Sequence, residues 1–329
     1  MVLISHLPPE LLFFILEFAC EDTKNFTYSP LGVELSLVCK YFCNIIRRNG
    51  LDLRYVAMEG METLEQFLGL LKRRSRHAKR VHSLFLSVDS AVGLKPTTES
   101  CQHMADLMAH ILREINPAHL SVLYIHLPYP CHIIVTPPIP LPCVFPALTD
   151  LVLSGAFIVN PPDKPSYAPR LERIQMWRVV VLPSEQTPEE LTRLAPNLTR
   201  LEICIQPNPS TAMMLCLPVT KYILAHCSKD SETTDHPFPP RLKQLVFDFY
   251  PCYALPKDTR ERHEQGILTF KILVLPDDDA PLMDALTIFP FPLDDIPPID
   301  DYEEREAARY EKLWEGWLKC TKGEDVSWS

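Results

Sequence analysis

The chain has 329 residues, of which 47% are hydrophobic and 22% are charged; this is typical of a folded globular protein and excludes disorder of the whole chain. It has 33 prolines and nine glycines, which indicates many short elements, and no G-x-G spacing, which argues against dinucleotide-binding and P-loop enzymes. The net charge of -10 arises from residues 277–329, so the body is neutral and general nucleic-acid binding is disfavoured.

The eleven cysteines form no C-x-x-C pair, and their odd number is typical of free thiols in a reducing compartment. The apolar stretch 11–16 lies between Glu10 and Glu17 and does not resemble a secretory signal. No apolar run approaches the roughly 20 residues that a membrane span needs. We therefore expect a cytoplasmic or nuclear protein, or one found in both places, without a membrane partner.

The first fifty residues predict two amphipathic helices. The segment LPPELLFFILEFA places Pro9 in a first helical turn and repeats apolar residues at helical spacing. A second helix is expected from about Ser29 to Arg48, followed by Asn49-Gly50 as its end. Two short helices bury little surface alone, so they need a partner in the same chain or in another.

Two motifs in this region are similar to those of a known family. The pattern L-P-x-E-L-x-x-x-I-L, followed by S-L-V-x-K-x-F, resembles an F-box, the helical module that docks on the small adaptor subunit of cullin-based ubiquitin ligases. Between the two halves, Cys20 to Glu34 is longer and more polar than the usual linker of that family. The alternative is a well-capped N-terminal helix packed on the rest of the protein. The resemblance assigns residues 1–50 to an F-box and implies adaptor contacts from Leu7, Pro8, Glu10, Leu11, Ile15, Leu16, Val38, Lys40 and Phe42.

Residues 51–80 are expected to form a linker with a strand and a helix. The helix is indicated by Leu64, Phe67, Leu68 and Leu71, which recur at helical spacing. The basic run 72–80 is then expected to be the solvated end of that helix, where basic side chains suit the helix dipole. A nuclear-import or phosphate-contacting patch is the alternative.

A degenerate frame, L-x-x-L-x-L, recurs within residues 81–290, and its starts are 23 to 44 residues apart. Its last two apolar positions are expected to point inward from a short strand, and helices return the chain between strands. The frame resembles the irregular leucine-rich repeats of many fungal F-box proteins, which implies an α/β solenoid of short parallel strands alternating with helices. An unrelated α/β domain with seven parallel strands is the alternative. The frame starts at Val81, Leu120, Leu148, Leu171, Leu198, Leu242 and Phe270.

In a solenoid of this kind, the residues between the inward leucines face the concave side, where partners bind. Arginine and aromatic residues are the usual anchors of binding surfaces, so Trp177 with Arg173 and Arg200 is the strongest candidate patch. Coverage of this face by loops or by the C-terminal tail is the alternative. The expected target-binding residues are Phe85, Tyr124, Arg173, Gln175, Trp177, Arg200, Glu202 and Asp248.

The last segment, residues 291–329, is acidic and contains an amphipathic helix. Its apolar stripe is formed by Tyr310, Leu313, Trp314, Trp317 and Leu318. Because the open end of a solenoid needs covering, we expect this helix to cap the last repeat. Binding of a partner is the alternative.

No Ser-His-Asp, Cys-His or metal-ligand pattern rises above chance, so we expect no catalytic residue, metal or cofactor and no enzymatic activity. The resemblances together imply the substrate-recognition subunit of an SCF-type ubiquitin ligase. Its expected partners are the adaptor, a cullin and an unidentified target protein, without nucleic acid. The alternative is a leucine-rich-repeat scaffold without a ubiquitin-ligase role.

Overall fold

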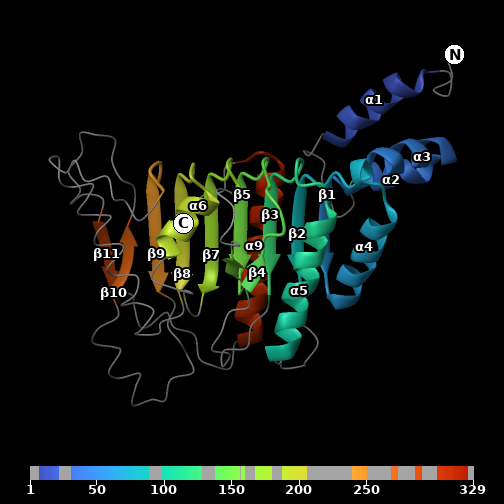
Figure 1. The fold of residues 1–329 in the computed structure, drawn as a ribbon. Coiled ribbons are helices and arrows are strands. Elements are labelled where there is room, and N and C mark those ends of the chain that lie inside the picture. The colour runs from blue at the N-terminus through green and yellow to red at the C-terminus, as the bar shows by residue number, and fades with distance from the viewer. Residues whose placement is uncertain are drawn as a thin grey trace.

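The computed structural model describes residues 7–21, 31–88, 98–127, 138–155, 157–159, 167–179, 187–205, 239–249, 268–272, 286–290 and 302–324. These residues form an α/β structure built around one parallel sheet (Figure 1). Among the helices of these ranges, none is both long and apolar enough to cross a membrane.

Three helices precede the sheet: α1 (Pro9–Glu21), α2 (Leu31–Val38) and α3 (Lys40–Asn49). The single helix expected up to Arg48 is wrong, because Cys39 is extended, with φ -161° and ψ 162°, and separates α2 from α3. The thiol of Cys39 caps α3 by accepting a hydrogen bond from the Phe42 N–H at 3.5 Å. Gly50 ends α3 in the left-handed conformation, with φ 70°, as its position in the sequence predicts. The core of this three-helix unit consists of Leu12, Leu16, Cys20, Ile46 and Leu51.

The main sheet has seven parallel strands that lie side by side in chain order (Figure 1). The first six repeat frames coincide with its last six strands, so their prediction as neighbouring parallel strands is confirmed. The frames are also in register, since the middle apolar residue of each strand pairs with that of the next, from Leu84 and Leu123 to Leu201 and Leu245. The strands are β1 (Tyr55–Glu59), β2 (Ser83–Ser87), β3 (Val122–His126), β5 (Asp150–Ser154), β7 (Arg173–Val179), β8 (Arg200–Ile205) and β9 (Gln244–Phe249).

The strand expected from the seventh frame, with Leu273 and Leu275 as its inward residues, lies almost entirely outside the described residues. The strand β10 (Leu268–Ile272), which ends before these inward residues, pairs antiparallel with β11 (Leu286–Pro290) in a separate two-stranded sheet. The seventh parallel repeat strand therefore stays a prediction. A further small parallel pair is formed by β4 (Pro138–Pro140) and β6 (Phe157–Val159).

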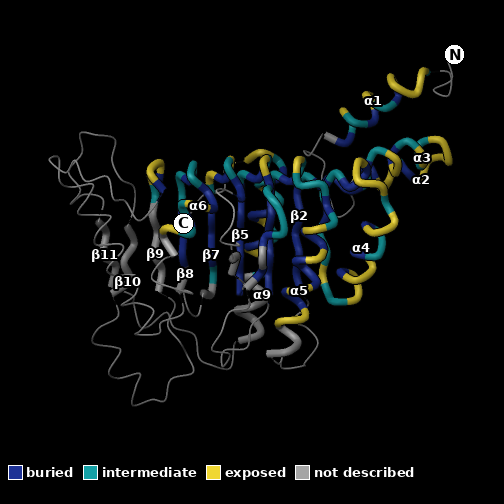
Figure 2. The backbone as a smooth tube through the Cα atoms, viewed as in Figure 1, coloured by how far each residue is buried: buried dark blue, intermediate teal, exposed yellow. Residues whose placement is uncertain are grey.

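One face of the main sheet is covered by α4 (Met61–Arg73), α5 (Thr98–Glu114) and α6 (Thr187–Leu194) (Figure 1). Their apolar side chains share one core with the alternate strand residues, such as Leu84, Leu151 and Leu201, which are buried as predicted. Figure 2 shows this continuous burial along the strands. The side chain of Leu245 lies outside the described residues.

The C-terminal helix α9 (Tyr302–Thr321) packs on the opposite face of the sheet. It runs against the strand direction, since Tyr310 contacts Glu59 and His126 at strand ends, while Cys320 contacts Tyr124. The expected cap on the last repeat is wrong: α9 lies across strands β1 to β7 and not over β9. The physical reason is that these strands present aromatic residues on this face, which match the apolar stripe of the helix.

Candidate functional site

The three-helix unit exposes large apolar side chains on its outer surface. In α1, Leu12 and Leu16 face the core of the unit, whereas Leu11 and Ile15 remain 51% and 53% exposed and Phe18 78% exposed. A helix that is apolar on both sides is normally covered on both. The outer side of α1 therefore has the composition of a binding surface.

The helices α2 and α3 add to this apolar surface near the break at Cys39. Leu37 and Val38 are the last two residues of α2, and they are 79% and 65% exposed. Exposed groups of large apolar residues are uncommon in monomeric proteins and mark interaction sites. We refer to the following set as the exposed N-terminal apolar residues: Leu11, Phe14, Ile15, Phe18, Val33, Leu37, Val38 and Tyr41.

The structure separates the residues expected to contact an adaptor into outer and inner positions. Leu16 is only 3% exposed and packs in the core of the unit, so the expectation that it faces a partner is wrong. Phe42 is half-buried against the same core, and Leu7 is also half-buried. The remaining members are on the surface, namely Pro8, Glu10, Leu11, Ile15, Val38 and Lys40.

Sequence reasoning missed Phe14, Phe18 and Leu37. A usable signal was present, because Leu11, Phe14, Ile15 and Phe18 follow one another at three- and four-residue spacing and share one side of α1. The other apolar series of α1 lies on the inner side. Two apolar series in one helix indicate two buried sides. The spacing does not show which side packs on the same chain and which is left for a partner.

Ion pairs attach the three-helix unit to the sheet. Glu17 of α1 lies 3.0 Å from Arg80 and 3.9 Å from Arg54, measured between carboxylate oxygen and guanidinium nitrogen. Arg74 donates two hydrogen bonds to the carboxylate of Asp52, at 2.7 and 2.5 Å. Such a bidentate pair fixes orientation as well as distance. These contacts set the direction in which the exposed N-terminal apolar residues face relative to the sheet.

The basic run 72–80 is therefore not simply the solvated helix end that we expected. Lys79 is buried and forms an ion pair with Glu114 at 2.5 Å. Arg80 binds the carboxylate of Glu17 in α1, and Arg74 binds that of Asp52, which follows α3. The run joins parts of the protein because it meets acidic residues distant in sequence. Spacing within the run cannot identify those partners.

Two histidines lie beside the same attachment. The rings of His82 and His119 have centroids 5.5 Å apart. Burial, and after it the nearby charges of Arg54, His119 and Arg80, lowers the pKa of His82 from 6.5 to about 4. His82 is therefore neutral at neutral pH, and its protonation would place a further positive charge beside the arginines that Glu17 holds.

The expected target-binding face is largely covered. Phe85 and Tyr124 are 1% and 3% exposed, and Trp317 of α9 lies over Phe85 with a centroid distance of 5.8 Å. The Tyr124 hydroxyl lies 3.3 Å from the sulfur of Cys320, and burial is the main cause that raises its pKa. The expectation that these two residues face a target is wrong, because α9 occupies their side of the sheet.

The polar members of that face are engaged with one another. Arg173 forms an ion pair with Asp150, and the amide of Gln175 donates a hydrogen bond of 2.9 Å to the carboxylate of Glu202. Gln175 and Glu202 are buried, so the expectation that they are open to a target is also wrong.

The arginine and tryptophan patch is only half-buried. Trp177 is partly covered and has the ammonium group of Lys312 5.4 Å from its ring centroid. Arg173 and Arg200 are half-buried as well. Asp248 lies in β9, but its side chain is outside the described residues.

Comparison with known proteins adds no family assignment. A scan against models of known protein families finds no match to this chain, and a search of curated proteins finds no significant relative. Within the described ranges, no three His, Cys, Asp or Glu side chains are grouped so that they could hold a metal ion.

Proposed function

We propose that this protein is the substrate-recognition subunit of an SCF-type ubiquitin ligase. In this proposal the three-helix unit is an F-box that docks on the adaptor, which in turn joins a cullin. The body is an irregular leucine-rich-repeat solenoid that selects a target protein. The chain performs no chemistry itself, because the other subunits of the ligase modify the target. The observation that supports the proposal most is the set of exposed N-terminal apolar residues.

The outer side of α1 and the end of α2 provide the apolar surface for this docking. Burial of a fully exposed Leu, Ile, Val or Phe side chain stabilises a complex by about 1.5–3 kcal/mol before the costs of association. Ile15, Phe18 and Leu37 are each more than half exposed. Their joint burial is enough to provide the centre of a specific interface, and adaptor binding would remove this apolar surface from water.

The proposal is tested by affinity capture of the full chain from cells, with the adaptor and the cullin as the readout. Ile15→Asp and Leu37→Asp should each abolish capture of both, because a carboxylate at the centre of an apolar interface loses its hydration. The melting temperature should stay unchanged, since both positions are exposed. Lys72→Asp, at an exposed position on α4, is the matched control and should capture both partners normally.

A leucine-rich-repeat scaffold without a ligase role is the second candidate. The observation that favours it is the pair of salt bridges at the β1 end of the sheet, from Glu17 to Arg80 and from Asp52 to Arg74. In that case the unit serves as an end cap. Capture of neither adaptor nor cullin by the wild-type chain would support this reading over the first.

A further inference from the structure

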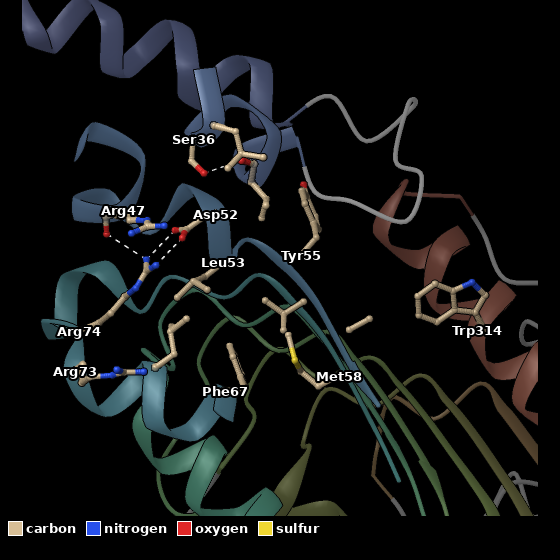
Figure 3. Close-up of a pocket in the computed structure, with 15 residues that line it drawn as sticks. Ser36, Arg47, Asp52, Leu53, Tyr55, Met58, Phe67, Arg73, Arg74 and Trp314 are labelled. Carbon is tan, nitrogen blue, oxygen red and sulfur yellow. Dashed lines mark hydrogen bonds and ion pairs between the residues drawn. The ribbon is translucent and has the colours of Figure 1, made fainter. Parts of the chain in front are cut away.

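A cavity of about 730 Å³ lies where the three-helix unit, β1 and α4 meet (Figure 3). Its apolar lining includes Val56 of β1, Phe67 of α4 and Leu53 just before β1, and Trp314 of α9 also lines it. The charged residues of the lining are Arg47, Asp52, Arg73 and Arg74.

The charges of this cavity are unbalanced. Its aspartate is already bound by Arg74 in the bidentate pair, and Arg74 also donates to the Arg47 carbonyl oxygen at 3.2 Å. Arg47 and Arg73 are exposed at the surface, so the cavity has an excess of positive charge. An anionic group is the complementary ligand for these two guanidinium groups.

The cavity borders the outer edge of the main sheet. In the ladder with β2, the Ser83 N–H donates to the Arg54 carbonyl at 2.9 Å, and the Gly60 N–H donates to the Ser87 carbonyl at 3.0 Å. Because a parallel ladder uses alternate residues of a strand, the even-numbered residues of β1 bond to β2. The N–H and C=O groups of Ala57 and Glu59 therefore point away from the sheet, and within the described ranges no strand pairs with this side of β1.

We infer that the edge of β1 binds an extended acidic peptide segment of a partner protein, which adds to the sheet as a further strand. An unpaired edge next to an apolar cavity provides the two components of strand addition, namely backbone hydrogen bonds and pockets for alternate side chains. Acidic side chains of the segment bind Arg47 and Arg73, which lie near the start of β1. Its apolar side chains contact Met58 and Leu70, which line the cavity and are only partly buried.

This inference does not depend on the ubiquitin-ligase proposal, because it uses only β1 and the cavity beside it. It assigns a recognition surface to the edge of the sheet, while the face that carries Phe85 and Tyr124 is largely covered by α9. The adaptor surface proposed above lies on the outer side of α1 and on the end of α2. Val33 and Leu37 of α2 also line the cavity, whereas Ile15 of α1 does not, so Ile15→Asp is the variant that disrupts the adaptor surface separately.

The test uses the full chain and an array of fluorescent eight-residue peptides that alternate Asp or Glu with Val, Ile, Leu or Phe. The wild type should bind members of this array, measured by fluorescence anisotropy. Ala57→Pro removes the outward N–H and leaves the ladder with β2 intact, so binding should weaken about fivefold, as expected for one lost hydrogen bond. Ala57→Ser keeps the N–H and is the matched control, with unchanged binding.

The charge requirement is tested at the arginines. The double substitution of Arg47→Gln and Arg73→Gln should weaken binding of the acidic peptides at least tenfold. The same peptides with Gln and Asn in place of Glu and Asp should bind the wild type weakly and lose little further affinity in the double variant.

A second measurement makes the backbone claim independent of variant folding. Peptides methylated on alternate amide nitrogens should lose binding in one phase of methylation and keep it in the other, because only one phase faces β1. No binding of any array member, equal loss in both phases, or equal affinity for a well-folded Ala57→Pro variant would overturn the inference. Adaptor capture should be unaffected by these variants. Failure of the wild-type chain to capture the adaptor would count against the ligase proposal alone.

Discussion

The packing of α9 makes a sharp prediction for Trp317. This side chain is 0% exposed and its ring lies 5.8 Å from Phe85 and 5.1 Å from Trp314, centroid to centroid. Truncation of such a residue removes transfer free energy and leaves a cavity, so Trp317→Ala should lower the free energy of unfolding by about 3–5 kcal/mol. Urea denaturation followed by circular dichroism measures this change. Hydrogen exchange should also increase in β2 and β3, which α9 covers.

Glu311→Ala is the matched control, because Glu311 is exposed on the same helix. It should change the free energy of unfolding by no more than about 0.5 kcal/mol. If Trp317→Ala costs no more than this control and leaves exchange in β2 and β3 unchanged, α9 does not pack on the sheet as described. The sheet face that carries Phe85 and Tyr124 would then not be covered by α9.

Two further predictions concern the attachment of the three-helix unit. A Cβ at Gly32 would lie 2.4 Å from the Leu51 carbonyl oxygen, whereas a Cβ at Gly69 meets nothing within 4 Å, so the same change to alanine should have opposite signs. Gly32→Ala should destabilise by more than about 1 kcal/mol and Gly69→Ala should stabilise by up to about 1 kcal/mol, both by urea denaturation, and stabilisation at Gly32 would contradict the close approach. For His82, burial and then Arg54 lower the folded pKa from 6.5 to about 4, so the unfolded chain binds more protons between these values. Stability from this group should be complete above pH 6.5 and should fall as the pH drops to about 4; a melting temperature in His82→Gln that falls with acid as steeply as in the wild type would argue against it.

The strands of the main sheet could be predicted because a two-residue period and a repeated frame determine both which side faces inward and which residues align. Leu151 and Leu201 are buried for this reason. Phe270 begins the seventh frame, yet it lies in β10, which pairs antiparallel with β11. The pattern specifies burial of one side, and the hydrogen-bonding partner depends on residues elsewhere in the chain.

The position of α9 could not be read from its apolar stripe. The stripe predicts that Leu313 and Trp317 are buried, and they are. It does not distinguish the end of a solenoid from its concave face, because both offer apolar surface. Phe85 and Tyr124 contained the missing information, since two aromatic residues at aligned positions of neighbouring strands form a broad apolar surface.

In α1, too, the apolar pattern does not show which surface each residue contacts. Leu11 and Leu16 both match the motif, but one faces outward and the other packs on Ile46 and Leu51 in the core of the unit. The helical pattern also did not predict the break at Cys39, because apolar spacing continues across this residue although its backbone is extended. Ion pairs such as Asp52 with Arg74 join segments about twenty residues apart, and no local period predicts them.

The central claim is that the three-helix unit binds the adaptor of a cullin-based ligase. The most direct measurement is a calorimetric titration of the full chain with purified adaptor. The account predicts saturable one-to-one binding with a negative heat-capacity change, as apolar burial requires, and loss of binding in Ile15→Asp and Leu37→Asp but not in Lys72→Asp. Absence of binding by the folded wild-type chain, or equal binding by all three variants, would contradict it.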